Sequence, residues 1–68
     1  MSKKDYEKIA KAFKDYYPIK GINESIEAYE TRLVQYLALR NKIADILKDD
    51  NPNFIAHRFV LATMPDTD

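Results

Sequence analysis

The chain has 68 residues, enough for one small domain, and its lack of cysteine excludes disulfides and thiolate metal sites. Its formal net charge is zero, so no basic excess points to nucleic acid. Hydrophobic residues make up 46% and charged residues 32%, which is typical of a folded globular chain rather than a disordered one. A single Gly argues for few turns and long helices.

The first predicted helix spans residues 3–16. Ser2 is expected to cap it, with Asp5 as the reciprocal partner of a capping box. Pro18 ends it, because the residue before a proline avoids the helical region. One helical face is apolar and carries Tyr6, Ile9, Ala10, Phe13, Tyr16 and Tyr17. The opposite face carries Lys4, Lys8 and Lys11.

Residues 17–22 are predicted to form a turn, in which Gly21 is the expected site of an unusual backbone angle. The second helix is predicted over 24–48, with Asn23 as its N-cap. Arg40 interrupts its apolar row, which consists of Ile26, Tyr29, Leu33, Tyr36, Ile43 and Leu47. At the usual rise per residue this helix is about 37 Å long and the first about 21 Å, so the first cannot cover it alone.

The third helix is predicted over 52–63, with Asn51 as the cap and Pro52 at the first helical position. Its expected inner face consists of Phe54, Ile55, Phe59 and Ala62. Residues 65–68 are expected to be a disordered tail.

These elements predict an all-α fold, a single domain over residues 1–68 with a long central helix. Helices 1 and 3 are expected to pack on the same wide apolar surface of the second helix. The stripe left over, around Leu39, Ile46 and Tyr36, predicts a homodimer.

No constellation indicates an enzyme or a cofactor. His57 falls on the polar side of the third helix, without the partners that a general base requires. Three carboxylates with helical spacing, Glu24, Glu27 and Glu30, allow a weak metal cluster, but a solvated face is the default. We therefore expect neither a catalytic nor a metal site.

The charge is uneven along the chain, with +3 in residues 1–20 and −3 in residues 21–68. The lysine face of the first helix leaves open a small nucleic-acid-binding accessory protein as the alternative function. Conversely, Glu24, Glu27 and Glu30 are candidates for contact with a basic partner.

Arg40 and Arg58 each lie among apolar positions of their own helix. A buried guanidinium is costly unless it is paired, so we expect an ion pair. The candidate acids are Asp15, Asp49 and Asp50. The alternative is contact with a partner protein, for which Arg40, Arg58 and Tyr36 are candidates because Arg and Tyr are enriched at binding hot spots.

Two short motifs carry a resemblance. They are the opening Lys3-Lys4-Asp5-Tyr6-Glu7-Lys8-Ile9-Ala10-Lys11-Ala12 and the later Asp50-Asn51-Pro52-Asn53-Phe54-Ile55-Ala56-His57-Arg58-Phe59. Both resemble the ends of many small uncharacterised bacteriophage and prophage proteins, although Ile55-Ala56-His57 and Thr63-Met64 depart from the usual ending.

That resemblance implies a phage or prophage origin. Small phage proteins often bind and redirect host proteins, including those of defence systems such as CRISPR. The leading hypothesis is thus a non-enzymatic protein that acts by protein–protein contact. The absence of a membrane-span-length apolar run and of a signal-like start predicts that it acts in the host cytoplasm.

Overall fold

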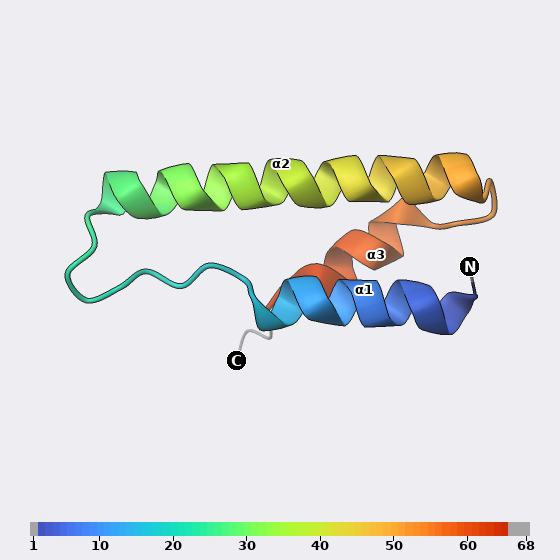
Figure 1. Ribbon diagram of the computed structural model, residues 1–68, viewed down its shortest axis with the longest axis horizontal. Helices are drawn as coiled ribbons and strands as arrows, with labels where there is room; N and C mark the ends of the chain where they lie inside the picture. Colours follow the sequence, from blue (N-terminus) through green and yellow to red (C-terminus); the bar gives the residue numbers. More distant parts are fainter. Residues whose placement is uncertain (1, 66–68) are drawn as a thin grey trace.

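A computed structural model describes residues 2–65 and contains three helices over this range (Figure 1). They are α1 (Lys3–Asp15), α2 (Ile26–Asp50) and α3 (Ala56–Thr63). No strand occurs among the described residues. The predicted all-α fold with a long central helix is therefore confirmed. The predicted tail lies, from residue 66 onward, outside the described part of the chain.

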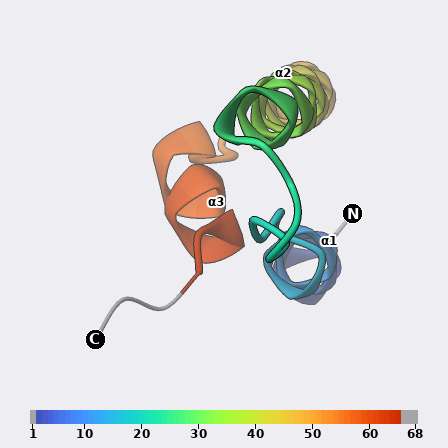
Figure 2. The ribbon, with the colours of Figure 1, turned by 90° about the vertical axis from the view of Figure 1, so that its left-hand side faces the viewer.

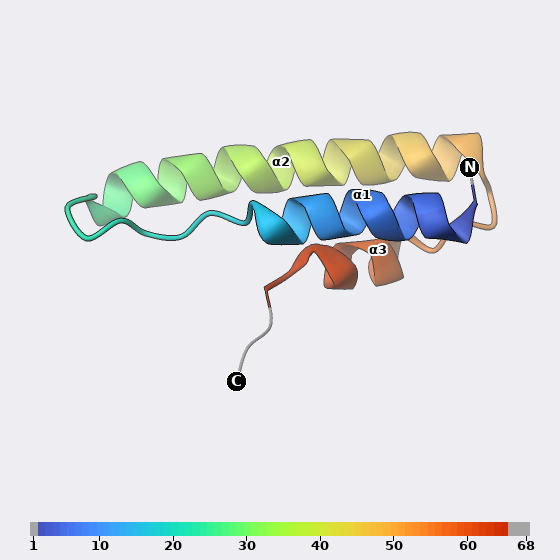
Figure 3. The ribbon, with the colours of Figure 1, turned by 60° about the horizontal axis from the view of Figure 1, so that its bottom comes forward.

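The three helices lie at the corners of a triangle when viewed end-on (Figure 2). Helix α1 runs antiparallel to α2, and α3 turns back from the end of α2 to lie against α1 (Figures 1 and 3). Helix α3 packs against both of the others. The first and third helices were predicted to pack on one face of the second. In the structure α3 instead contacts both α1 and α2 and holds them together.

The core is small and lies under the C-terminal half of α2. Its buried apolar side chains are Ala10, Ala44, Leu47, Phe54 and Phe59. Aromatic rings extend it along the molecule in one continuous series, with centroid distances from 4.8 to 6.3 Å. In order of contact the series is Tyr6, Phe54, Phe59, Phe13, Tyr36 and Tyr17. Edge and tilted ring pairs of this kind contribute beyond the area that they bury.

The N-terminal part of α2 projects beyond the other helices (Figure 1). As a result Ile26 is exposed, although it shares the apolar row of α2. Tyr16, the residue directly after α1, is also exposed, contrary to its predicted place on the inner face of the first helix. Of the stripe predicted to remain uncovered on α2, Leu39 and Ile46 are exposed as expected. Tyr36 is instead half-buried against Phe13.

Helix α2 begins at Ile26, two residues later than predicted, and Ser25 rather than Asn23 caps it. The hydroxyl Oγ of Ser25 accepts a hydrogen bond from the backbone N–H of Ala28 at 3.1 Å. Asn23 lies instead within the exposed loop before the helix. A serine oxygen placed here satisfies one of the four N–H groups that a helix start leaves unpaired.

Helix α3 begins at Ala56, four residues later than predicted. The segment before it forms a turn, in which the Phe54 N–H donates to the Asn51 carbonyl at 2.9 Å. The Asn51 side-chain oxygen accepts from the Asn53 N–H at 3.0 Å, as is typical of an Asx turn. Pro52 occupies the second position of this turn, which suits proline, and is therefore not the first residue of a helix as predicted. Of the predicted inner face, Ile55, which directly precedes α3, and Ala62 on α3 are exposed, whereas Thr63 at the end of α3 is buried.

Candidate protein-binding surfaces

The loop between α1 and α2 is fixed by polar contacts. The guanidinium of Arg32 donates two hydrogen bonds to the carboxylate of Glu24, both 2.7 Å long. It donates a third to the backbone carbonyl of Ile19, at 3.1 Å. One arginine on the second turn of α2 thus holds two points of the loop in place, and the fork geometry makes this a strong, directional contact.

Glu24 closes the same loop from the other side. Its Oε1 accepts the N–H of Gly21 at 3.0 Å, and its own N–H donates to the Gly21 carbonyl at 3.2 Å. Hydrogen bonds from Arg32 and then from Gly21 lower the pKa of the Glu24 carboxyl from 4.5 to about 2. Gly21 does not have the positive φ expected of it, so the tight closure comes from Glu24 and not from glycine geometry.

Four large apolar side chains around this loop face solvent. Their exposed fractions range from 62% for Ile26 to 99% for Ile22. We call these side chains the loop surface; they are Tyr16, Ile19, Ile22 and Ile26. Because the loop is held by polar contacts, these side chains are not needed to anchor it. Groups of exposed apolar residues with polar neighbours are typical of protein interaction sites.

The predicted ion pair of Arg40 is wrong. Its side chain is buried, with 7% exposed, and its Nε and Nη2 donate only to the Asn41 side-chain oxygen, at 3.3 and 3.1 Å. Its Nη1 is buried and has no hydrogen-bond partner within residues 2–65. Asp15 pairs instead with Lys11, at 2.8 Å. Arg40 is therefore a costly buried cation that no carboxylate of the described chain neutralises.

Tyr36 joins α1 to α2. Its hydroxyl donates to the backbone carbonyl of Phe13, and its ring lies between those of Phe13 and Tyr17. Burial, followed by the nearby Tyr17 hydroxyl, raises the pKa of Tyr36, whereas Arg40 opposes the increase. Tyr36 thus has a structural role in this chain, and the structure separates it from the exposed stripe with which it was grouped.

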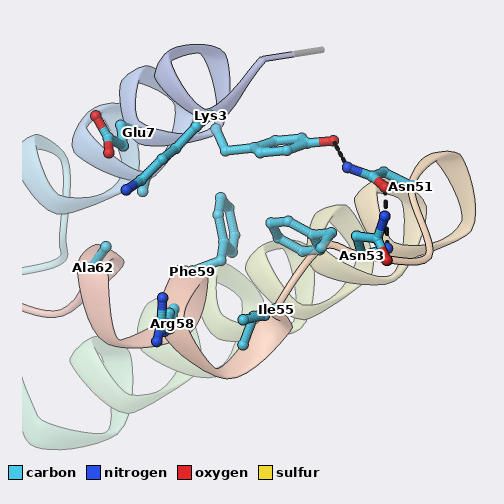
Figure 4. Close-up of a pocket in the computed structure, with 11 residues that line it drawn as sticks. Lys3, Glu7, Asn51, Asn53, Ile55, Arg58, Phe59 and Ala62 are labelled. Carbon is cyan, nitrogen blue, oxygen red and sulfur yellow. Dashed lines mark hydrogen bonds between the residues drawn. The ribbon is translucent and has the colours of Figure 1, made fainter.

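Arg58 is exposed and forms no ion pair with any residue of the described range, so its predicted pairing is also wrong. It lies on α3 at the edge of a groove against α1 (Figure 4). Arg40 and Arg58 therefore lie in opposite environments, one buried and one exposed, despite their similar sequence patterns.

The remaining charged candidates are exposed. Glu27 and Glu30 lie on the first turns of α2, beside Ile26, and neither forms an ion pair within residues 2–65. Lys4, Lys8 and Lys11 are also exposed on α1, but Lys11 is held by Asp15. The structure does not bring Glu24 into a cluster with Glu27 and Glu30, because Glu24 is committed to Arg32.

His57 is exposed on α3. Within the described range, no three His, Cys, Asp or Glu side chains lie together as metal ligands would. Across the same residues, no helix has both the length and the apolar character needed to cross a membrane.

The sequence reading missed Arg32 and the loop side chains Ile19 and Ile22. A signal was present, because the predicted turn, residues 17–22, contains the apolar residues Tyr17, Ile19 and Ile22. Loops normally run over the surface, so apolar residues there indicate either burial beneath another element or a binding role. The Arg32–Glu24 contact had no such signal, since Glu24 lies outside the helix that carries Arg32.

No protein family, no curated protein and no solved structure was found to match this chain.

Proposed function

We propose that this protein acts without catalysis, by binding a partner protein through its loop surface. The observation that carries the proposal is the set of four exposed apolar side chains on, and at the two ends of, a loop that Arg32 and Glu24 hold in place. A loop that is already ordered loses little conformational entropy on binding, which favours affinity.

The charges around the loop surface indicate the kind of partner. Glu27 and Glu30 contribute two exposed carboxylates beside Ile26, against the single lysine Lys20 in the loop. A partner that presents apolar side chains flanked by Lys or Arg would be complementary to this surface. If the chain has the phage origin that its sequence suggests, that partner is a protein of the host cell, for example a defence protein.

The test compares three immobilised proteins in a lysate of the cell in which the chain acts. They are the wild type, the double variant Ile19→Ser/Ile22→Ser and the control Leu61→Ser. Leu61 is also exposed, but it belongs to α3 and not to the loop surface. We expect the wild type and the control to retain the same protein, and the double variant to lose it by about tenfold or more.

Quantitative mass spectrometry gives the readout, and circular dichroism checks that each variant is folded. Retention of the same proteins by the loop variant would contradict the proposal. The double variant Glu27→Lys/Glu30→Lys tests the charge: it should lower retention, and unchanged retention would exclude a basic partner surface.

A further inference from the structure

A second surface, separate from the loop, lies between α1 and α3. It is a groove that contains a depression of about 340 Å³, with α1 and α3 as its walls (Figure 4). Its apolar lining comes from both helices and from the turn before α3. These residues include Tyr6, Ala10, Phe54, Phe59 and Ala62. A volume of this size is within the range of pockets that take a ligand or a large side chain.

The groove continues along α1. A second depression, of about 310 Å³, shares Glu7, Ala10 and Ala62 with the first and extends to Asp15. The α1 residues that line the second depression lie about four positions further along the helix than those that line the first. Four positions correspond to about one helical turn, or about 6 Å. Side chains at positions i and i+4 of a docked helix have this spacing, so the groove fits the apolar face of one helix.

The edges of the groove carry more positive than negative charge. Lys3 on α1 and Arg58 on α3 lie on opposite walls, and both are exposed (Figure 4). Neither is hydrogen-bonded or ion-paired to another residue of the described range. Glu7 is the carboxylate between them, and Asp15 in the second depression is already paired with Lys11. An occupant with carboxylates beside its apolar side chains would therefore be favoured.

We propose that the α1–α3 groove binds an acidic amphipathic helix of a partner protein. Two large apolar side chains one turn apart occupy the two depressions, and flanking Asp or Glu side chains approach Lys3 and Arg58. This site goes beyond the proposed function, because it uses different residues and prefers the opposite charge. It gives the small protein two docking surfaces of unlike specificity.

A designed peptide serves as the probe. It is a fluorescein-labelled, end-blocked helix of about 16 residues, roughly 24 Å long, built from Ala and Glu with Leu at two positions four apart. Two matched peptides replace every Glu by Lys, or both Leu by Ala. Fluorescence anisotropy should show binding of the first peptide and at least about fivefold weaker binding of either control. Added salt should weaken the binding of the acidic peptide.

Variants of the protein locate the site. Arg58→Glu should weaken binding of the acidic peptide by about fivefold, whereas Lys42→Glu should change it by less than about twofold. The control makes the same charge change at an exposed position on α2 outside the groove. Ala62→Gln, at an exposed position, fills the groove without changing the charge and should also weaken binding. Circular dichroism confirms that each variant is folded.

Three peptide-binding results would overturn the assignment. They are equal binding of the acidic and basic peptides, no binding of the acidic peptide by the wild type up to its solubility limit, and unchanged binding by Arg58→Glu. A wild-type mass in solution that falls when the peptide is added would identify a second copy as the natural occupant and would also overturn it. The variant Ile19→Ser/Ile22→Ser should bind the peptide like the wild type, so failure at the groove is distinguishable from failure at the loop surface.

Discussion

At the scale of single residues, the two arginines of α2 show how position decides the energetic role of one side-chain type. Arg32 donates three hydrogen bonds at the surface and orders a loop. Arg40 is buried and leaves one nitrogen without a partner among the described residues. A hydrogen-bonded guanidinium at the surface loses little solvation, whereas a buried one loses much of its hydration.

Replacing Arg40 by methionine should therefore stabilise the fold. Arg40→Met keeps most of the side-chain length and removes the buried charge, so we expect the free energy of unfolding to rise by about 1 kcal/mol or more. Urea denaturation followed by circular dichroism measures it. Arg32→Met is the control and should lower stability, since it removes the loop contacts. A loss of stability in Arg40→Met would show that the guanidinium has a partner that contributes more than its burial costs.

The Glu24–Arg32 contact should respond to acid. Because the folded pKa of Glu24, about 2, lies below its ordinary value of 4.5, the stability that this carboxylate contributes is fully present above pH 4.5. It is lost as the pH falls from about 4.5 towards 2. The amide signal of Gly21, the only glycine, reports the change in NMR because its N–H donates to Glu24.

We expect the Gly21 amide to shift with a midpoint near pH 2 in the wild type, and this response to disappear in Glu24→Gln. A midpoint near 4.5 would contradict the charged contact, since an unpaired glutamate titrates there.

At the scale of elements, capping and turn residues decide where each helix begins. Near the start of α2, Asn23 and Ser25 are both good N-cap residues, and only the structure distinguishes them. Glu24 forms a closed turn with Gly21, which keeps residues 21–24 out of the helix. Before α3, the Asn51 turn delays the helix in a similar way and inserts Phe54 into the core.

The two candidate caps give a direct test. Ser25→Ala should lower the free energy of unfolding by about 1 kcal/mol, because the Ala28 N–H loses its acceptor. Asn23→Ala should change it by no more than a few tenths of a kcal/mol, because Asn23 is exposed outside the helix. Thermal or urea unfolding measures both variants. The opposite order would place the helix start at residue 24, as the sequence alone suggested.

At the scale of the whole molecule, the chain is elongated for its size. Its radius of gyration is 13.4 Å, against about 11 Å for a compact domain of 68 residues. Its accessible surface is 5410 Å², whereas a compact monomer of 8.0 kDa exposes about 4,450 Å². The chain therefore exposes roughly 950 Å² more than a compact monomer of its mass.

The homodimer expected from the sequence stays a prediction. Leu39 and Ile46 remain exposed one above the other on the outer side of α2, where a second copy would cover them. Light scattering at micromolar concentration should give twice the chain mass of 8.0 kDa, about 16 kDa, and Leu39→Ser/Ile46→Ser should halve it. A wild-type mass of 8.0 kDa would exclude the homodimer.

The sequence by itself determined that the chain is three helices with a long central one. Hydrophobic spacing and the breaks at Pro18 and Asn51-Pro52 are local signals, so they could be read without knowing what packs where. The lysine face of α1, the exposed His57 and the cap at Ser2 follow from the same local rules.

Only the tertiary structure decided which apolar and charged groups are covered. Coverage depends on how far α1 and α3 extend along α2, and this is a non-local property of the packing. Ile26 shares a helical face with the buried Ala44, yet it faces solvent because no helix reaches it. Likewise, Arg40 is buried and Arg58 is exposed at the edge of the groove, although both lie among apolar positions of their helices. Helical periodicity predicts the face on which a residue lies, but the neighbouring elements determine whether that face is buried.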